Sequence, residues 1–267
     1  MQSDTAQQPS VAVAVPAYNE AEGIAGFLAE IDSALRPHTA RLTLVVVDDA
    51  STDGTAEVLQ ATAASLGAEV EVIRSAHNQG HGATLLWAYR RALQTGPDFV
   101  LAVDGDGQFS GADVRRALVL LIDNAHAVCG VRRFRQDPWF RMAMTRLLRL
   151  YVRTGFQVGA RDPNCPLRGY EAGLLGGLLN ELPERCLIPN LYLTVLASRQ
   201  GLPLLEVDVS HRVRRGETKQ GTSWGGAARS PIPWRLVRFS AAALRESLRF
   251  RTTLRNREPA AGVQQLS

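Results

Sequence analysis

The sequence predicts an α/β fold with a mostly parallel central sheet that is flanked by helices. Short apolar runs alternate with amphipathic stretches in the order 11–15, 20–35, 42–47, 55–66, 70–74, 82–95 and 99–103. Strands that alternate with helices of this length indicate βαβ units and a parallel sheet. A polar segment also follows each of the four strands directly, at the sheet edge where such folds bind ligands.

The elements of the first half each have a recognisable pattern. Residues 11–15 and 42–47 are continuous apolar runs, as expected for buried strands. The helix between them has an apolar face made of Ile24, Phe27, Leu28, Ile31 and Leu35. A Ser-Thr-Asp-Gly run at 51–54 precedes the second helix and caps it.

The second half continues the alternation less regularly. We expect helices and strands at 113–124, 127–131, 135–155, 169–182 and 203–212, and a terminal helix from Pro233 onward. One α/β domain is expected over 10–222. A basic amphipathic segment follows over 223–257, and disordered ends are expected at 1–9 and 258–267.

Charge and cysteine content narrow the possible functions. The chain has 267 residues, of which 45% are hydrophobic, enough for an enzyme-sized core. The net charge is +4, and Lys219 is the only lysine among 30 basic residues. The three cysteines are widely spaced and form no CxxC pair, so the sequence indicates neither a disulfide framework nor a zinc site. A protein of the reducing cytoplasm fits this cysteine content best. Neither a membrane-spanning run nor an export signal is recognisable.

The most informative segment is Asp104-Gly-Asp106-Gly-Gln108, which follows the apolar run at 99–103. Residues two apart in an extended segment point to the same side, so Asp104 and Asp106 are placed to bind one divalent cation. The glycines between them leave the backbone clear for a diphosphate. The alternative is an ordinary Asp-Gly turn.

The other three strands end in comparable motifs: Pro16-Ala-Tyr18-Asn19-Glu20, Asp48-Asp49-Ala-Ser51-Thr-Asp53-Gly54, and Asn78-Gln-Gly80-His-Gly82. Their carboxylates suit ribose hydroxyls, base N–H groups and a cation, and their glycines admit a phosphate to the backbone. Neither GxGxxG nor GxxxxGK(S/T) is present, so a dinucleotide fold and a P-loop are excluded. Asp53 has the alternative role of supporting the turn at Gly54.

The motifs VAVPAYNE, VVVDDASTDGT, NQGHGATLLWAY and VDGDGQF, in this order, resemble the family 2 inverting glycosyltransferases of the GT-A fold. In the second half, three segments are similar to the branch of dolichol-phosphate mannose synthases and related polyprenyl-phosphate sugar synthases: Gly130-Val-Arg132, Asp162-Pro-Asn-Cys-Pro-Leu-Arg168 and Arg214-Arg215-Gly216-Glu217-Thr218-Lys219. The resemblance covers residues 11–222. It implies a GT-A domain that acts on a GDP- or UDP-hexose.

The resemblance also implies site residues at the matching positions. The nucleotide sugar would be bound by Pro16, Tyr18, Glu20, Asp48, Asp104, Arg214, Arg215 and Lys219. The ligands of Mg²⁺ or Mn²⁺ would be Asp104, Asp106 and Gln108. The acceptor phosphate would meet Arg132, Arg141 and Thr145, and the catalytic set would be Asp106, Arg132 and Lys219. The spacing from the loop arginines to Gly216 is shorter than in the family, which leaves open whether Arg214 or Arg215 contacts the diphosphate.

Two features of the second half have simpler interpretations. Asp162 and Arg168 could form a structural ion pair that shapes the acceptor loop. The shared helical face of Arg141, Arg146, Arg149 and Arg153 is either an ordinary solvated surface or a patch that meets a lipid phosphate.

The terminal helix has an apolar stripe beside a row of arginines. The stripe consists of Trp234, Val237, Ala241, Leu244 and Leu248, and the row of Arg235, Arg238, Arg245 and Arg249. Such a helix is typical of contact with an anionic membrane, and the alternative is packing onto the protein's own core. No nucleic-acid-binding module is recognisable, so we expect no such partner. The predicted location is cytoplasmic, peripheral on the membrane.

Together, these observations predict transfer of a hexose to a polyprenyl phosphate with inversion. Mannose is the sugar that we favour, with GDP-mannose as its donor. An ionised phosphate acceptor needs no strong general base. One alternative is a family 2 enzyme with a glycan or small-molecule hydroxyl acceptor. The other is a catalytically silent, membrane-associated nucleotide-binding protein.

Overall fold

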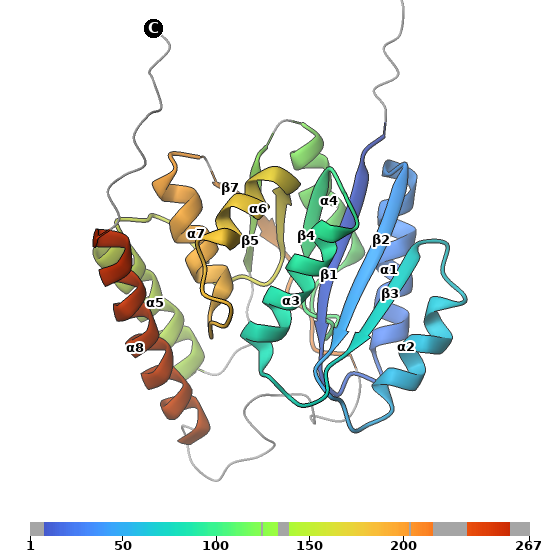
Figure 1. Cartoon of the computed structure of the whole chain (residues 1–267), viewed down its shortest axis with the longest axis horizontal. Coiled ribbons are helices and arrows are strands. Elements are labelled where there is room, and N and C mark those ends of the chain that lie inside the picture. The colour runs from blue at the N-terminus through green and yellow to red at the C-terminus, as the bar shows by residue number, and fades with distance from the viewer. Residues whose placement is uncertain (1–7, 124, 133–138, 203, 216–233, 257–267) are drawn as a thin grey trace, which may run out of the picture.

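The computed structural model describes residues 8–123, 125–132, 139–202, 204–215 and 234–256 (Figure 1). Within these ranges one sheet has the strand order β3-β2-β1-β4-β6-β5-β7. The strands are β1 (Ser10–Ala17), β2 (Arg41–Asp48), β3 (Glu69–Arg74), β4 (Phe99–Ala102), β5 (Ala127–Arg132), β6 (Arg168–Glu171) and β7 (Leu204–Val209). Among these described strands, β6 alone runs antiparallel to its neighbours, β4 and β5. The predicted α/β fold with a mostly parallel sheet is therefore confirmed.

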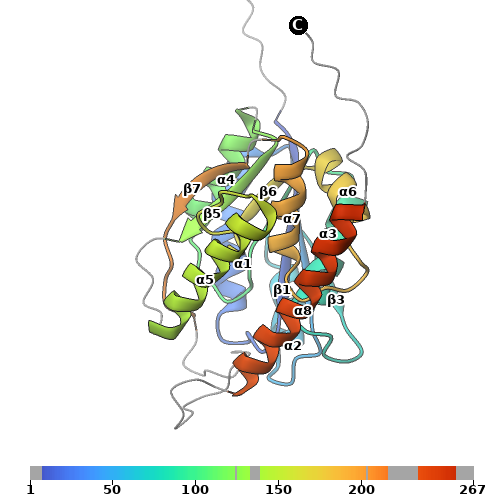
Figure 2. The ribbon, with the colours of Figure 1, turned by 90° about the vertical axis from the view of Figure 1, so that its left-hand side faces the viewer.

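Helices cover both faces of the sheet (Figures 1 and 2). One layer contains α1 (Ile24–Leu35), α2 (Thr55–Ala63) and α4 (Gly111–Ile122), and a short 3-10 helix, Arg36–His38, follows α1. The other layer contains α3 (His81–Gln94), α5 (Trp139–Phe156), α6 (Ala172–Asn180), α7 (Pro189–Arg199) and α8 (Trp234–Asn256). Side chains of β1 alternate between the layers: Val11, Val13 and Val15 face the first, and Ala12 and Ala14 the second.

Two elements differ from the sequence-based expectation. The helix expected at 169–182 begins only at Ala172, because Arg168–Glu171 pair with β4 and β5. A Cβ on Gly169 would lie 2.7 Å from Leu121 Cδ1, which explains the glycine in this central strand. Helix α7 was not expected at all. Its residues Pro189–Ala197 are all buried, and a helix buried on every side has no amphipathic stripe to recognise.

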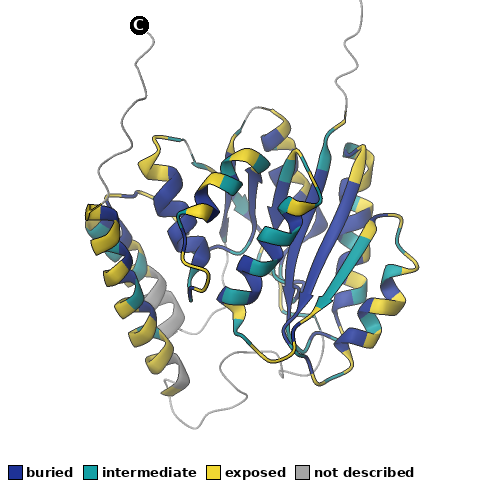
Figure 3. Cartoon of the chain, in the orientation of Figure 1, coloured by how far each residue is buried: buried dark blue, intermediate teal, exposed yellow. Residues whose placement is uncertain are grey.

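The terminal helix α8 packs on the core with a face other than the predicted stripe (Figure 3). The core-facing residues are Ala243, Ser247, Phe250 and Leu254, and Glu246 accepts hydrogen bonds from the Leu187 backbone N–H (2.9 Å) and Tyr192 (3.0 Å). The stripe residues described, Trp234, Val237, Ala241, Leu244 and Leu248, stay exposed. The alternative that this helix packs on the protein's own core is therefore confirmed for α8, but through a face other than the stripe.

No helix among the described residues is long and apolar enough to cross a membrane. The predicted boundary at 222–223, the tail 258–267 and most of the segment 1–9 lie outside the described residues.

Candidate active site

Backbone hydrogen bonds join the carboxyl ends of β1, β2 and β4. The backbone N–H of Gly105 donates to the Pro16 carbonyl (3.1 Å), which joins the segment after β4 to the end of β1. The N–H of Asp49 donates to the Ala17 carbonyl (2.9 Å), which joins β1 to β2. The predicted motifs are thus brought together, as expected for strand tips of a doubly wound sheet.

The two carboxylates after β4 have the properties of a cation site. Asp104 Oδ1 is buried and accepts no hydrogen bond from the described residues, and His81 Nε2 lies 3.7 Å away from it. Asp106 accepts a hydrogen bond from the Gln108 backbone N–H (3.0 Å). Burial, and then the negative charge of Asp104, raises the pKa of Asp106 to about 6. A bound divalent cation would give the unpartnered Asp104 oxygen a partner and would offset the repulsion between the two carboxylates.

The donor set fits a cation that shares its ligands with a nucleotide. No group of three or more His, Cys, Asp or Glu side chains that could hold a metal occurs in the described part of the chain. Mg²⁺ is commonly bound by one or two carboxylates together with substrate phosphates, so Asp104 and Asp106 suffice for that arrangement. The side-chain nitrogen of Gln108 donates weakly to the Arg212 carbonyl (3.4 Å), and its role as a ligand stays a prediction.

A second orphaned carboxylate oxygen lies at the tip of β2. Asp48 is fully buried, its Oδ1 accepts a hydrogen bond from the Ser51 N–H (3.0 Å), and its Oδ2 accepts none from the part of the chain that the structure describes. Arg74 Nε lies 3.5 Å from Oδ2, close enough for an ion pair but without hydrogen-bond geometry. Carboxylate and guanidinium together offer acceptor and donor groups to a polar ring such as a nucleobase. Half-buried Tyr18 follows the neighbouring tip of β1.

Glu20 and Arg214 are in direct contact although they are 194 residues apart. The Arg214 Nε donates to Glu20 Oε2 (3.2 Å), and its Nη2 donates to Oε1. Burial raises the pKa of Glu20 to about 8, against the lowering effect of Arg214, and the charges of Asp106 and Asp104 add to the increase. Arg214 therefore reaches the carboxylate cluster, and its contact with a diphosphate stays a prediction.

Arg215 turns away from that cluster. Its Nη2 forms an ion pair with Glu30 of α1, and its guanidinium carbon lies 5.9 Å from the centre of the Phe27 ring. The two adjacent arginines of the predicted loop therefore lie in different surroundings.

Arg132 ends β5 at the same edge of the sheet as the other tips. It is held by Asp162 in a two-pronged pair, Nε to Oδ2 at 2.7 Å and Nη2 to Oδ1 at 2.9 Å. The suggested Asp162–Arg168 ion pair is wrong. Arg168 is fully buried because β6 turns it inward, and it donates to the carbonyls of Pro163 (2.6 Å) and Cys165 (2.9 Å).

Three predicted residues have no described side chain. Lys219 lies outside the described residues, and the side chains of Arg141 and Thr145, within α5, are not described either. Their roles stay predictions.

Sequence reasoning missed two groups at this edge. Arg74 had a usable signal, because it is the last residue of β3 and must lie with the other tips. Asp49 accepts hydrogen bonds from the Gln79 N–H (2.7 Å) and the Gly80 N–H (2.9 Å), which holds the turn where Gly80 has φ +87°.

Asp53 has the supporting role that was one of its two interpretations. Its carboxylate accepts hydrogen bonds from the backbone N–H groups of Thr55 (3.1 Å) and Ala21 (3.1 Å).

The family description "Glycosyl transferase family 2" matches residues 12–170. Among curated proteins, an undecaprenyl-phosphate 4-deoxy-4-formamido-L-arabinose transferase from Serratia proteamaculans (strain 568) is 28% identical over 211 residues, 78% of this chain and 62% of that protein. The protein of the same name from Pseudomonas paraeruginosa (strain DSM 24068 / PA7) is 29% identical over 210 residues, 78% of this chain and 60% of that protein. The chain thus spans less than two thirds of the length of these relatives.

Among solved structures, glucosyl-3-phosphoglycerate synthase from Mycobacterium tuberculosis with Mn²⁺, UDP-glucose and phosphoglyceric acid has a TM-score of 0.64 and 19% identity. That match covers 91% of this chain and 80% of the other. The complex of the same enzyme with Mn²⁺, UDP and glucosyl-3-phosphoglycerate has a TM-score of 0.61. At this identity the likeness concerns the fold, and it agrees with the GT-A architecture. From the family match over more than half of its length, the chain belongs to glycosyl transferase family 2.

Proposed function

We propose that this chain transfers a sugar from a nucleoside-diphosphate sugar to a polyprenyl phosphate, with inversion at the anomeric carbon. The observation that carries the donor half is the buried, unpartnered oxygen of Asp104 beside Asp106 at the strand tips of a family 2 chain. Support for the acceptor comes from the curated relatives, whose names specify undecaprenyl phosphate and whose similarity extends beyond the family match to 211 residues.

In the proposed reaction, an oxygen of the acceptor phosphate attacks the anomeric carbon. The bond from that carbon to the diphosphate breaks, and its electron pair leaves with the nucleoside diphosphate. Asp104, Asp106 and Gln108 would hold Mg²⁺ or Mn²⁺, which when bound stabilises the charge that grows on the leaving diphosphate. Because the acceptor is already ionised, no side chain needs to remove a proton.

The remaining residues bind and orient the substrates. Asp48 and Arg74 would contact the base, and Pro16 and Tyr18 would border the base and ribose. Arg132, fixed by its two hydrogen bonds to Asp162, would present a guanidinium to a phosphate with little loss of side-chain freedom. Lys219, Arg141 and Thr145 are proposed to bind phosphate as well.

The identity of the sugar is proposed separately. Mannose from GDP-mannose is the prediction from sequence, whereas the names of the relatives specify 4-deoxy-4-formamido-L-arabinose. Nucleotide-activated forms of both sugars are therefore tested as donors. UDP-glucose is tested as well, as the donor of another hexose.

The experiment offers each radiolabelled donor with a polyprenyl phosphate and Mn²⁺ or Mg²⁺. We expect label in the organic phase with at least one donor, and none in EDTA or with Asp106→Asn. Asp98→Asn, the same change at the opposite end of β4, serves as the active control. Label transferred only to a glycan or glycerol hydroxyl would favour the hydroxyl-acceptor alternative, and nucleotide binding without turnover would favour the silent binding protein.

A peripheral membrane contact on the cytoplasmic face is proposed for α8 together with α5. On α8, the exposed fractions are 71% for Trp234, 49% for Leu244 and 47% for Leu248, and on α5 they are 66% for Leu147 and 57% for Leu150. Exposed arginines accompany them: Arg146, Arg149, Arg153, Arg238, Arg245 and Arg249. Apolar side chains beside basic ones fit an anionic lipid surface.

Co-sedimentation with liposomes tests this contact. The double variant Leu244→Gln/Leu248→Gln should lose binding to anionic vesicles, whereas Leu205→Gln, an exposed leucine on edge strand β7, should keep it. Point variants are preferable to truncation before α8, which would uncover Phe250 and Leu254 of the core. Equal binding by all three proteins would contradict the assignment.

A further inference from the structure

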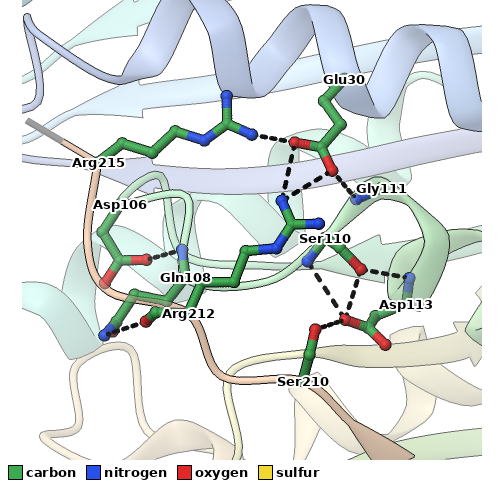
Figure 4. Close-up of polar contacts among 9 residues, drawn as sticks. All are labelled: Glu30, Asp106, Gln108, Ser110, Gly111, Asp113, Ser210, Arg212 and Arg215. Carbon is green, nitrogen blue, oxygen red and sulfur yellow. Dashed lines mark hydrogen bonds and ion pairs between the residues drawn. The ribbon is translucent and has the colours of Figure 1, made fainter.

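The segment that follows β7, residues 210–215, lies across the loop that carries the carboxylates (Figure 4); we call it the strap. Its backbone is joined to that loop at two points. The N–H of Arg212 donates to the Gln108 carbonyl (2.8 Å), and the N–H of Arg215 donates to the Asp106 carbonyl (3.1 Å). At its start, Ser210 is hydrogen-bonded to Asp113 of α4. The strap therefore contacts the predicted metal-binding loop at Arg212 and Arg215 and the neighbouring helix α4 at Ser210.

One carboxylate on α1 accepts hydrogen bonds both from the strap and from the first residue of α4, which follows the loop. Glu30 Oε1 accepts hydrogen bonds from the Gly111 backbone N–H (2.7 Å) and from Arg212 Nη1 (3.2 Å), and Oε2 accepts one from Arg215 Nη2 (Figure 4). The Glu30 and Arg215 side chains are half-buried, so solvent screens their pair less than a surface pair.

The side chain of Arg215 occupies a slot lined by glycines. A Cβ on Gly23 would lie 2.7 Å from Arg215 Cβ, and a Cβ on Gly107 would lie 2.7 Å from its Cδ. Gly107 also has φ +69°, a conformation that favours glycine. With Phe27 beneath the guanidinium and Glu30 at its end, this side chain is held on α1.

Arg214 extends from the same backbone to the opposite side, where it meets Glu20. The two side chains leave adjacent backbone positions for different partners, so fixing Arg215 on α1 holds the backbone from which Arg214 reaches the strand tips. A diphosphate bound there would offer Arg214 a charged, two-pronged partner in place of the Glu20 carboxylate.

We propose that Glu30 and Arg215 are positioning residues that hold the strap on the Asp104–Gln108 loop, and that Arg214 is the strap arginine that contacts the diphosphate of the nucleotide sugar. The assignment of Arg214 rests on the proposed function. The anchoring by Glu30 and Arg215 does not, because it involves no ligand.

Nucleotide binding without turnover tests the role of Arg214. Calorimetry with Mn²⁺ compares UDP with UMP, and GDP with GMP. Arg214→Gln should weaken binding of the diphosphate at least about tenfold and leave that of the monophosphate unchanged, since a hydrogen bond between charged groups is lost. The control variant is Arg91→Gln, in the last turn of α3 and away from the strand tips. It removes the same charge and should change the affinity for neither the diphosphate nor the monophosphate.

Two further measurements test the anchor. Glu30→Gln leaves every trypsin site intact, so faster cleavage after Arg212, Arg214 or Arg215 in the nucleotide-free protein would report a released strap. Arg215→Gln and Glu30→Gln should each weaken binding of the diphosphate by a smaller factor, and the double variant should be no worse than the single ones. Unchanged urea midpoints of these variants would separate a released strap from general unfolding.

The outcomes are distinguishable. Loss of diphosphate discrimination in Arg215→Gln but not in Arg214→Gln would reverse the two roles and overturn the proposal. Unchanged trypsin cleavage of Glu30→Gln, or additive effects in the double variant, would overturn the anchor. If the wild-type protein binds neither UDP nor GDP, the proposed function is wrong and the role of Arg214 with it, whereas the trypsin result still decides the anchor.

Discussion

Acidification should weaken Mn²⁺ binding to the nucleotide-free protein about tenfold between pH 7.5 and pH 5. Asp106 is the group concerned, because burial and Asp104 raise its pKa to about 6, while the Gln108 N–H, Arg214 and His81 act in the opposite direction. A cation needs the ionised carboxylate. At pH 7.5 nearly all of the Asp106 carboxyl is ionised, and at pH 5 about one part in ten is, which gives the predicted factor.

Electron paramagnetic resonance of free Mn²⁺ measures this affinity directly. Asp106→Asn should abolish binding, and His81→Asn should keep the pH dependence, because protons compete with the cation for the Asp106 carboxylate. An affinity that is the same at both pH values would refute either the raised pKa of Asp106 or its role as a ligand.

Three further predictions concern stability, each measured by urea unfolding. Gly82→Ala should destabilise the protein by about 1–3 kcal/mol, since the new Cβ would lie 2.1 Å from the Cys186 carbonyl oxygen. Gly177→Ala, whose Cβ would meet nothing within 4 Å, should stabilise the protein by about 0.5–1 kcal/mol. Equal effects of the two substitutions would contradict the packing at α3. Phe250→Ala should cost about 3–5 kcal/mol if α8 belongs to the core, and a loss under about 1 kcal/mol would argue against it. The pKa of Glu20 is raised from 4.5 to about 8, so its contribution to the free energy of unfolding is fully present below pH 4.5 and is lost as the pH rises through 8. Glu20→Gln should flatten this decline in stability with pH. An unchanged dependence of stability on pH would contradict the raised pKa.

The parallel half of the fold was predictable because its signals are local. Apolar runs of strand length and the stripe of α1 each lie within one short stretch, and the order of strands and helices then implies the parallel sheet. Strand β6 and helix α7 lack such signals. Arg168 and Gly169 carry no strand pattern and are strand residues only because β4 and β5 pair with them, and α7 is buried on every side.

The candidate site shows the same division. Asp48, Asp104 and Asp106 could be found because they directly follow strands whose carboxyl ends meet at one edge. Glu30 could not be found, since an acidic residue on a helix resembles any solvated position. Its contacts with Arg212 and Arg215 join residues 182 and 185 positions apart, and only the folded chain brings them together.

The central claim is that a glycosyl group, and not a phosphorylated sugar, is transferred to a lipid phosphate. Mass spectrometry of the lipid product, combined with identification of the released nucleotide, tests it most directly. We predict a polyprenyl chain that carries one phosphorus and one sugar, with release of the nucleoside diphosphate. A lipid product with two phosphorus atoms and release of the nucleoside monophosphate would contradict the account.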